Sequence, residues 1–320
     1  MRSGLRYVRY APNLQGSLLR AFGFTFFVSA VWSLLALVAR RDLRQGAMGY
    51  GILNGSLGLG AVGAASTLAM LRKRVDADTL LAATSIYYVA ALVVLALVHS
   101  PIPVIVTLLG AGFAWTATMS TLNVSVQLSI PRWVQARALG LYLMTFQGGL
   151  ALGSVVWGAV AQHFSTKTAF LAAAAGMAVS LPFLLRIHIL KGQLPDLTPH
   201  ELTRPAPAYA PADPSHGPVR VSIEFRVAAE QLPAFTAAIY DLQGVRRRDG
   251  ASRWGIYRDA SDPTRLNETF IMESWLEYLR SRERVTAADA AIRDRVWALH
   301  AGPEPPQITH QIWLSEENRL

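Results

Sequence analysis

The sequence predicts a multi-domain membrane protein, in which an all-α bundle of six transmembrane helices is followed by a small α+β domain. Hydrophobic residues make up 52% of the 320-residue chain and charged residues only 16%, which is too apolar for a soluble protein of this size. The charge is unevenly spread, because residues 1–218 carry 16 Lys/Arg and 6 Asp/Glu whereas residues 219–314 carry 13 of each. At residue 219 the hydrophobic pattern changes from long apolar runs to strict alternation.

Six apolar runs are long enough to cross a hydrocarbon core about 30 Å thick, which takes about 20 residues of helix. The predicted spans are about 18–39, 49–70, 80–98, 102–127, 137–162 and 166–187. Residues 1–17 form a short amphipathic segment interrupted at Pro12, and the membrane domain, 18–191, ends after the sixth span.

An even number of spans places both ends of the membrane domain on one side. That side collects eleven Lys/Arg, including the basic loop Arg72-Lys73-Arg74, and the other side collects four. Because cytoplasmic loops are enriched in Lys and Arg, we expect both termini of an integral plasma-membrane protein in the cytoplasm. The cluster Arg40–Arg44 is basic but lies on the other side, so it is the one loop whose charge opposes this orientation.

Small residues recur four positions apart in two of the spans, and this spacing lets helices approach closely in lipid. The pairs predicted to pack helices are Gly51 and Gly55, Gly149 and Gly153, and Ser154 and Gly158.

The span cores contain no Asp or Glu, so a proton-coupled cycle would need its titratable group elsewhere. On the fourth span Trp115, Met119, Asn123 and Gln127 recur every four residues. They could line a pathway for an amphipathic solute, or they could hold helices together by hydrogen bonds. The candidate pathway residues are Asn54, Trp115, Thr116, Met119, Asn123, Gln127 and Gln147.

Residues 192–218 contain seven prolines and are expected to form an extended linker. Residues 219–314 then read as β-α-β-β-α-β, the order of a ferredoxin-like α+β domain, with residues 315–320 as a short tail. The expected strands are 219–227, 252–258, 266–274 and 307–314, and the expected helices are 229–247, 275–282 and 286–300.

Several function classes find no support in the sequence. There is no cysteine, the histidines are scattered, and no Gly-rich phosphate loop follows a strand, so we expect no metal, cofactor or ATP site. The arginines lie between apolar runs rather than on one aromatic-lined face, which argues against nucleic acid as a partner. The run Arg246-Arg247-Arg248 fits either a solvated helix end or contact with anionic lipid headgroups.

In the α+β domain, five residues would fit an enzymatic site, but strand alternation already explains several of them, so no catalytic residue is predicted. They are Trp254, Tyr257, Glu268, Glu273 and His300.

Three stretches together resemble a known family: LRYVRYAPNLQGSLLR at the start, FQGGLALGSVVWG in the fifth span, and RRRDGASRWGIYRDASDP with ETFIMESW and ERVTAAD in the tail. They resemble the major facilitator superfamily, in its bacterial branch of transmembrane secretion effectors, which is similar to the enterobactin exporter. The resemblance implies efflux of a small siderophore- or drug-like solute by alternating access across the bacterial inner membrane. The tail resembles the antibiotic-biosynthesis-monooxygenase type of ferredoxin-like domain, which implies a tail-mediated homodimer.

Such transporters have twelve spans, whereas this chain resembles helices seven to twelve plus the tail. The resemblance therefore implies half of a major-facilitator fold, with the first half missing through a truncated or split reading frame, or supplied by a partner six-helix bundle. The coupling residue is then expected in that other half. The alternatives are a membrane-tethered monooxygenase-like enzyme and a regulatory or dimerisation module on a membrane anchor.

Overall fold

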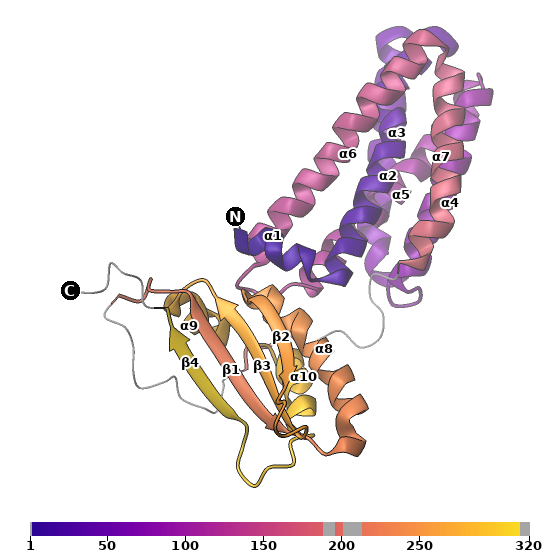
Figure 1. Cartoon of the computed structure of the whole chain (residues 1–320). Coiled ribbons are helices and arrows are strands. Elements are labelled where there is room, and N and C mark those ends of the chain that lie inside the picture. Colours follow the sequence, from indigo (N-terminus) through magenta and orange to yellow (C-terminus); the bar gives the residue numbers. More distant parts are fainter. Residues whose placement is uncertain (1, 188–195, 201–212, 314–320) are drawn as a thin grey trace. The chain divides into compact units, whose positions relative to one another are not determined.

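The computed structural model describes residues 2–187, 196–200 and 213–313 (Figure 1). The chain forms two compact units. One is the helical bundle, Asn13–Ser129 with Leu139–Leu194, and the other combines Met1–Pro12, Ile130–Ala138 and Pro195–Leu320. The α+β domain thus shares its unit with the N-terminal helix α1 (Arg2–Arg9) and with a connection between two spanning helices.

Six helices are long and apolar enough to cross a membrane, and they confirm the predicted bundle. They are α2 (Pro12–Leu37), α3 (Gly46–Leu71), α4 (Ala77–Leu97), α5 (Pro101–Leu128), α6 (Gln135–His163) and α7 (Thr166–Arg186). Even the shortest, at 21 residues, is about 32 Å long at 1.5 Å per residue. A π-helical turn, η1 (Val38–Asp42), extends the first span.

The first spanning helix starts six residues earlier than the sequence pattern indicated, because Pro12 begins α2 rather than only ending the amphipathic segment. Proline suits the first turn of a helix, where its missing N–H has no partner to lose. This earlier start places Arg20 in the third turn of α2, well inside the helix.

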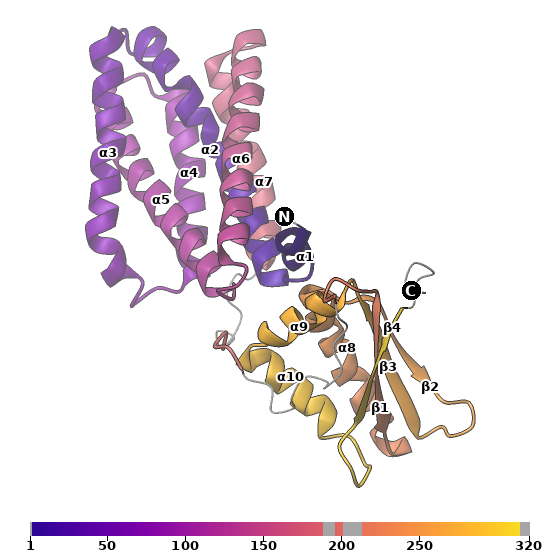
Figure 2. The ribbon, with the colours of Figure 1, turned by 90° about the vertical axis from the view of Figure 1, so that its left-hand side faces the viewer.

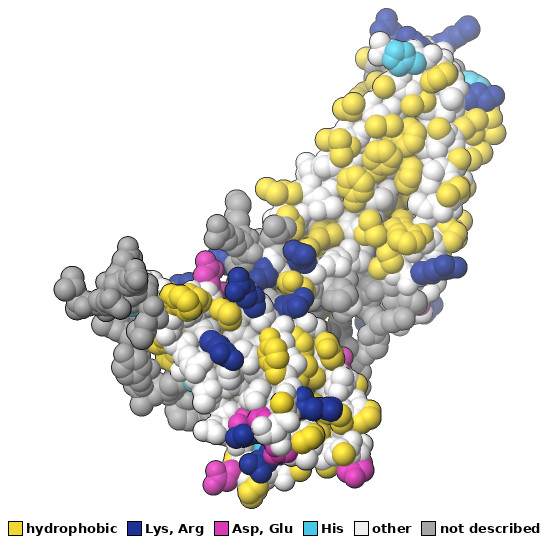
Figure 3. Space-filling view, in the orientation of Figure 1, with side chains coloured by type: hydrophobic (Ala, Val, Ile, Leu, Met, Phe, Trp, Pro, Cys, Tyr) yellow, Lys and Arg dark blue, Asp and Glu magenta, His cyan; other side chains and the backbone are white. Residues whose placement is uncertain are grey.

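The surface of the bundle is apolar along its length (Figure 3). Val106, Val179 and Phe183 are 60–80% exposed, which suits side chains that face lipid. The helices differ in how much the bundle covers them: 56% of the apolar window of the first span is buried, but only 17% of that in α6.

The α+β domain has a four-stranded antiparallel sheet of order β2-β3-β1-β4. Its elements are β1 (Val219–Arg226), the short 3-10 helix η2 (Ala229–Gln231), α8 (Leu232–Asp249), β2 (Ser252–Arg258), β3 (Arg265–Met272), α9 (Trp275–Glu283), α10 (Ala287–Trp297) and β4 (Gln307–Ile312). The strands β2 and β1 run parallel with β3 between them, and β3 and β4 run parallel with β1 between them. This is the predicted split βαβ arrangement.

The alternation in β1 decides which face of the sheet is covered. Val219, Val221, Ile223 and Phe225 are buried, whereas the intervening residues are partly or fully exposed. Helices α8, α9 and α10 lie on one face of the sheet (Figure 2). The other face carries Arg220, Ser222 and Glu224, in register with polar and apolar residues of β3 and β4.

Only parts of the predicted linker are described. Residues 196–200 run beside the start of α10, with Pro199 bridged to Thr286 and the Ala287 N–H donating to the Thr198 carbonyl at 3.0 Å. The rest of the linker, apart from 213–218, and the predicted tail 315–320 lie outside the described residues.

Candidate functional site

Trp115 lies in an aromatic cluster of the bundle. Its ring centroid is 5.4 Å from that of Trp32, 5.7 Å from that of Phe146 and 6.2 Å from that of Phe24. These rings come from α2, α5 and α6. Trp115 is half-buried and Trp32 is 41% exposed, so the cluster presents aromatic faces beyond the core of the bundle. Such faces can contact the apolar part of a solute.

The rest of the α5 stripe becomes more exposed along the helix. Met119 packs against the apolar core, Thr116 and Asn123 are half-buried, and Gln127 is exposed. The Gln127 amide donates to the Asn123 amide oxygen, one turn earlier on the same helix. The structure therefore joins the two amides within α5, where they form one polar patch.

Other residues make the hydrogen bonds between helices. The Thr118 hydroxyl bonds to the Thr84 hydroxyl at 2.8 Å, and the Tyr88 hydroxyl donates to the Ala111 carbonyl at 2.8 Å. The Trp157 indole N–H donates to the Phe26 carbonyl at 2.8 Å. The helices of the bundle are held together by these contacts and by apolar packing.

Asn54 on α3 and Gln147 on α6 are both exposed. Gln147 follows Phe146 of the aromatic cluster, whereas Asn54 lies on a helix that contributes no ring to it. An amide facing hydrocarbon is unfavourable, so both positions suit a surface that meets a polar cavity or another protein.

A buried ion pair in the bundle was not predicted from the sequence. The Arg20 guanidinium lies 2.8 Å from the Asp78 carboxylate and donates from Nε to the Leu184 carbonyl at 2.9 Å. Arg20 is only 5% exposed, so α2, α4 and α7 meet around a desolvated charge. Arg20 and Asp78 are 58 residues apart in the sequence, so no local pattern indicates the pair.

Two of the predicted packing glycines lie at a close helix contact. A Cβ at Gly149 or Gly153 would collide with Thr25 or Ser29 of α2. Ser154, beside them on α6, is half-buried. The contact between α3 and α5 is instead made by Gly60 and Gly112, each of which faces a backbone carbonyl of the other helix. The remaining positions have open space around them: Gly51, Gly55 and Gly158.

The predicted basic loop joins α3 to α4. Arg72 donates to the hydroxyls of Ser120 at 2.9 Å and Thr121 at 3.2 Å on α5, while Lys73 and Arg74 are exposed. The loop ends at Asp76, which caps α4 by accepting a hydrogen bond from the Thr79 N–H at 3.0 Å. This bond holds the pKa of the Asp76 carboxyl below its usual value.

The structure gives the tail residues that would fit an enzymatic site mainly structural partners. Glu268 is fully buried and accepts from Arg246 at 3.0 and 3.2 Å and from the Trp254 indole at 2.9 Å. His300 Nδ1 accepts from the Arg226 N–H at 2.9 Å. Tyr257 and Glu273 are exposed. No group of three metal-ligating side chains occurs among the described residues.

The α+β domain contains a cavity of ≈ 360 Å³ between its sheet and its helices. Apolar side chains such as Phe270 and Ile308 line it from the sheet, and Tyr278, Arg282 and Trp297 line it from α9 and α10. A cavity of this size, apolar with a few polar groups, suits a small amphipathic molecule.

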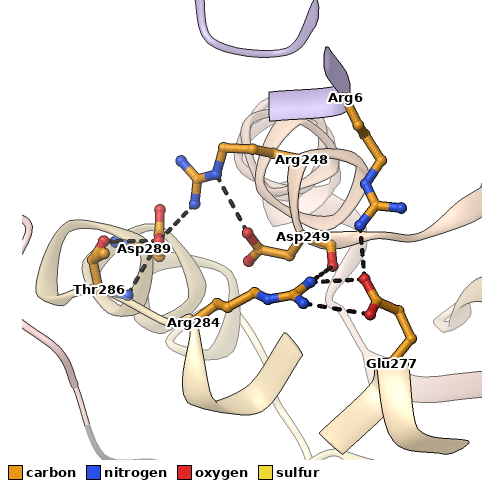
Figure 4. Close-up of polar contacts among 7 residues, drawn as sticks. All are labelled: Arg6, Arg248, Asp249, Glu277, Arg284, Thr286 and Asp289. Atoms are coloured by element: carbon orange, nitrogen blue, oxygen red, sulfur yellow. Dashed lines mark hydrogen bonds and ion pairs between the residues drawn. The ribbon is translucent and has the colours of Figure 1, made fainter. Parts of the chain in front are cut away.

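A charge network ties α1 to the α+β domain (Figure 4). Arg6 and Arg284 both donate to Glu277 Oε1 at 2.8 Å, and the two hydrogen bonds overcome the effect of burial and hold the pKa of Glu277 below its usual value. Arg248 bonds to Asp289 at 2.6 Å and to Asp249 at 3.4 Å. Gly250 has a φ of +128°, and a Cβ at this position would lie only 3.0 Å from the Arg6 guanidinium.

Two aromatic residues complete this contact. Tyr7 of α1 is 2% exposed, lies under the Arg248 guanidinium at 5.4 Å and meets Trp133 edge-on at 5.7 Å. Burial raises the pKa of the Tyr7 hydroxyl to about 12. Arg284 lies over the Trp133 ring at 4.7 Å. The α+β domain thus holds both the N-terminal helix and the connection between α5 and α6.

Comparison with known proteins agrees with this architecture. The family model for transmembrane secretion effectors matches residues 1–319. No curated protein matches the chain. No solved structure matches it either. The family match covers nearly the whole chain, and the six membrane-length helices and the α+β tail agree with it. The chain is therefore an integral membrane protein that belongs to the transmembrane secretion effectors of the major facilitator superfamily.

Proposed function

We propose that this chain forms one half of an exporter that moves a small amphipathic, siderophore- or drug-like solute out of the cytoplasm by alternating access. The observation that carries the proposal is the α5 surface from Trp115 to Gln127, which combines half-buried aromatic rings with a pair of amides. Aromatic faces suit the apolar part of such a solute, and the amides suit its polar groups.

The second half of the exporter would be another six-helix bundle, on a preceding stretch of chain or on a separate polypeptide. The sparse burial of α6, at 17%, and the exposed amides of Asn54 and Gln147 support a further protein surface there. Substrate sites in transporters of this architecture lie between the two halves, near the middle of the membrane. Both termini would be cytoplasmic, on the side that carries eleven of the basic residues flanking the spans.

A transport assay in inverted membrane vesicles tests the proposal with a panel of fluorescent amphipathic solutes. We expect solute to accumulate in vesicles that contain the complete transporter, and Trp115→Ala to reduce the initial rate at least fivefold. Val124→Ala, nine residues further along the same helix and on its opposite side at a 39% exposed position, is the matched control and should keep the rate. Equal rates for the two variants would contradict a role for the Trp115 surface.

A second candidate function belongs to the α+β domain and is favoured by its cavity of ≈ 360 Å³. A small aromatic metabolite held there could regulate transport or be oxidised. Oxygen consumption by the full chain with quinol substrates separates the two: turnover supports an enzyme, and saturable binding without turnover supports a regulatory site. Absence of both contradicts this candidate.

A further inference from the structure

A cationic hollow lies between α1 and the sheet of the α+β domain, within one compact unit. Its volume is ≈ 810 Å³. Among the described residues, four arginines line it, Arg6, Arg9, Arg247 and Arg253, together with Tyr10 and one carboxylate, Glu273. Arg6 is already paired with Glu277 at 2.8 Å. The lining therefore holds an excess of positive charge, and Figure 3 shows Lys and Arg side chains gathered around the position of α1.

The three consecutive arginines at the end of α8 have different partners. Arg246 is bound to the buried Glu268, and Arg248 is bound to Asp249 and Asp289. Arg247 lies over the Tyr10 ring at 5.9 Å and has no carboxylate within ion-pair distance among the described residues. Two members of the run thus stabilise the fold, and Arg247 alone faces the hollow.

Arg253 reaches the hollow from an unusual backbone conformation. Its φ is 48°, in the left-handed region that non-glycine residues rarely adopt, and it lies where the pairing of β2 with β3 shifts register between Ser252 and Gly255. Backbone outliers of this kind cluster at ligand sites. The side chain is exposed and forms no ion pair within the described part of the chain. A charge held in this way lacks a structural partner and is available to a ligand.

The lining determines the chemistry of that ligand. Guanidinium groups bind phosphate oxygens through two parallel N–H···O bonds, so several arginines around one hollow select a phosphate group. Arg9 and Arg247 each lie 5.9 Å from the Tyr10 ring, which places the cations around an amphipathic ring of the kind found at membrane interfaces.

The chain itself ties the hollow to a membrane surface. Tyr10 is two residues before Pro12, where the spanning helix α2 begins. A hollow lined by Tyr10 must therefore lie close to the end of that helix, where phospholipid headgroups are the most abundant phosphates. We infer that this hollow binds a phosphate group, and that the group belongs to the headgroup of an anionic phospholipid.

Lipid binding to the full chain, purified in a mild non-ionic detergent, tests the inference. Dioctanoyl phosphatidylglycerol or dioctanoyl phosphatidylcholine is titrated in, and native mass spectrometry measures the fraction of protein with bound lipid. We expect saturable binding of phosphatidylglycerol and at least tenfold weaker binding of phosphatidylcholine. The double variant Arg247→Gln/Arg253→Gln should weaken phosphatidylglycerol binding about thirtyfold, the effect of removing two basic contacts.

Arg220→Gln/Arg258→Gln is the matched control, because it removes the same charge from exposed positions of β1 and β2 outside the hollow. It should bind phosphatidylglycerol like the wild type. Equal losses in the two double variants would overturn the inference, because they would show that only overall charge matters. Equal binding of both double variants and the wild type would overturn it as well. Unchanged melting temperatures would show that all variants are folded.

A second arm identifies the source of the phosphate. Glycerol 1-phosphate and inorganic phosphate are added in place of the lipid, and the melting temperature is followed. Stabilisation by phosphatidylglycerol but not by the soluble phosphates at the same concentration supports the lipid headgroup. Stabilisation by a soluble phosphate that equals or exceeds that by the lipid, and that is lost in Arg247→Gln/Arg253→Gln, would overturn the lipid source.

Discussion

Glu268 shows how a single residue of the α+β domain depends on its partner. The carboxylate is fully buried between Arg246 and the Trp254 indole. Arg246→Met would remove the compensating charge while keeping a side chain of similar length over Phe270, where the guanidinium now lies at 5.0 Å. A buried charge that loses its partner costs about 3–5 kcal/mol. We expect the α+β domain to lose about that much unfolding free energy, measured by hydrogen exchange of its strands.

Arg258→Met is the control for this prediction. Arg258 is exposed at the end of β2, so its loss should change the exchange free energy by less than about 0.5 kcal/mol. Similar losses of unfolding free energy in both variants would mean that the Arg246–Glu268 pair does not stabilise the domain.

Asp249 makes the stability of the α+β domain depend on pH. Burial raises the pKa of its carboxyl to about 7, against the opposing effect of Arg248. Its unfolded pKa is about 3.9. Between these values the folded state binds more protons than the unfolded state, so the unfolding free energy falls as the pH rises from about 4 to about 7. Asp249→Asn removes this titration and should flatten the pH dependence over that window.

Because the chain has no cysteine, a single introduced thiol can be used to measure this pH dependence. Val296 is fully buried in the α+β core, so Val296→Cys places one thiol whose labelling rate reports the opening of this domain. Asp294→Asn, at a carboxylate that is 61% exposed, should leave the pH dependence unchanged. If the slope is the same with and without Asp249→Asn, then Asp249 does not titrate in this range.

At the scale of elements, glycines of the same helix have different roles. On α3, a Cβ at Gly60 would collide with the backbone of α5 at Leu109, whereas one at Gly55 would meet nothing within 4 Å. Gly60→Ala should therefore push α3 and α5 apart and lower the melting temperature of the bundle by several degrees, while Gly55→Ala should not lower it. Thermal unfolding of the chain in detergent checks this; a larger loss with Gly55→Ala would contradict the observed helix contact.

The elements that the sequence predicted well are those with a strong local signal. The alternation Val219-Val221-Ile223-Phe225 identifies β1 because period two has no other reading over nine residues. The six spans follow from apolar length alone. The start of α2 differs from the prediction because a proline can either end one helix or begin the next.

The functional surfaces were harder to predict, because they depend on contacts between distant segments. Nothing near Tyr7 indicates that it is covered by Trp133 and Arg248, which lie 126 and 241 residues further along the chain. The run Arg246-Arg247-Arg248 is evident in the sequence, but its division into two structural arginines and one that faces the hollow requires the positions of Glu268 and Asp289. The four-residue spacing of the α5 stripe was visible, whereas its aromatic neighbours were not.

At the scale of the whole molecule, the proposed transporter half requires a partner bundle, and α3 offers a surface for it. Gly55 is exposed with open space around it, and the neighbouring Asn54 is an exposed amide. Small residues spaced for close approach, next to a polar group, suit a helix of another bundle better than lipid. The homodimer expected from the tail would instead use the open face of the sheet around Ser222.

The mass of the complex extracted from its own membrane distinguishes these assemblies. We expect the chain of 34.9 kDa to copurify with a second six-helix bundle, covalently continuous with it or separate. If the second bundle is a separate polypeptide, Gly55→Leu should reduce that association at least tenfold, because the new side chain occupies the space a partner helix would use. Val179→Leu, at an 80% exposed position on α7, is the control and should leave it intact. A mass of two copies, unaffected by Gly55→Leu, would favour the tail-mediated dimer, and the chain alone would contradict the partner bundle.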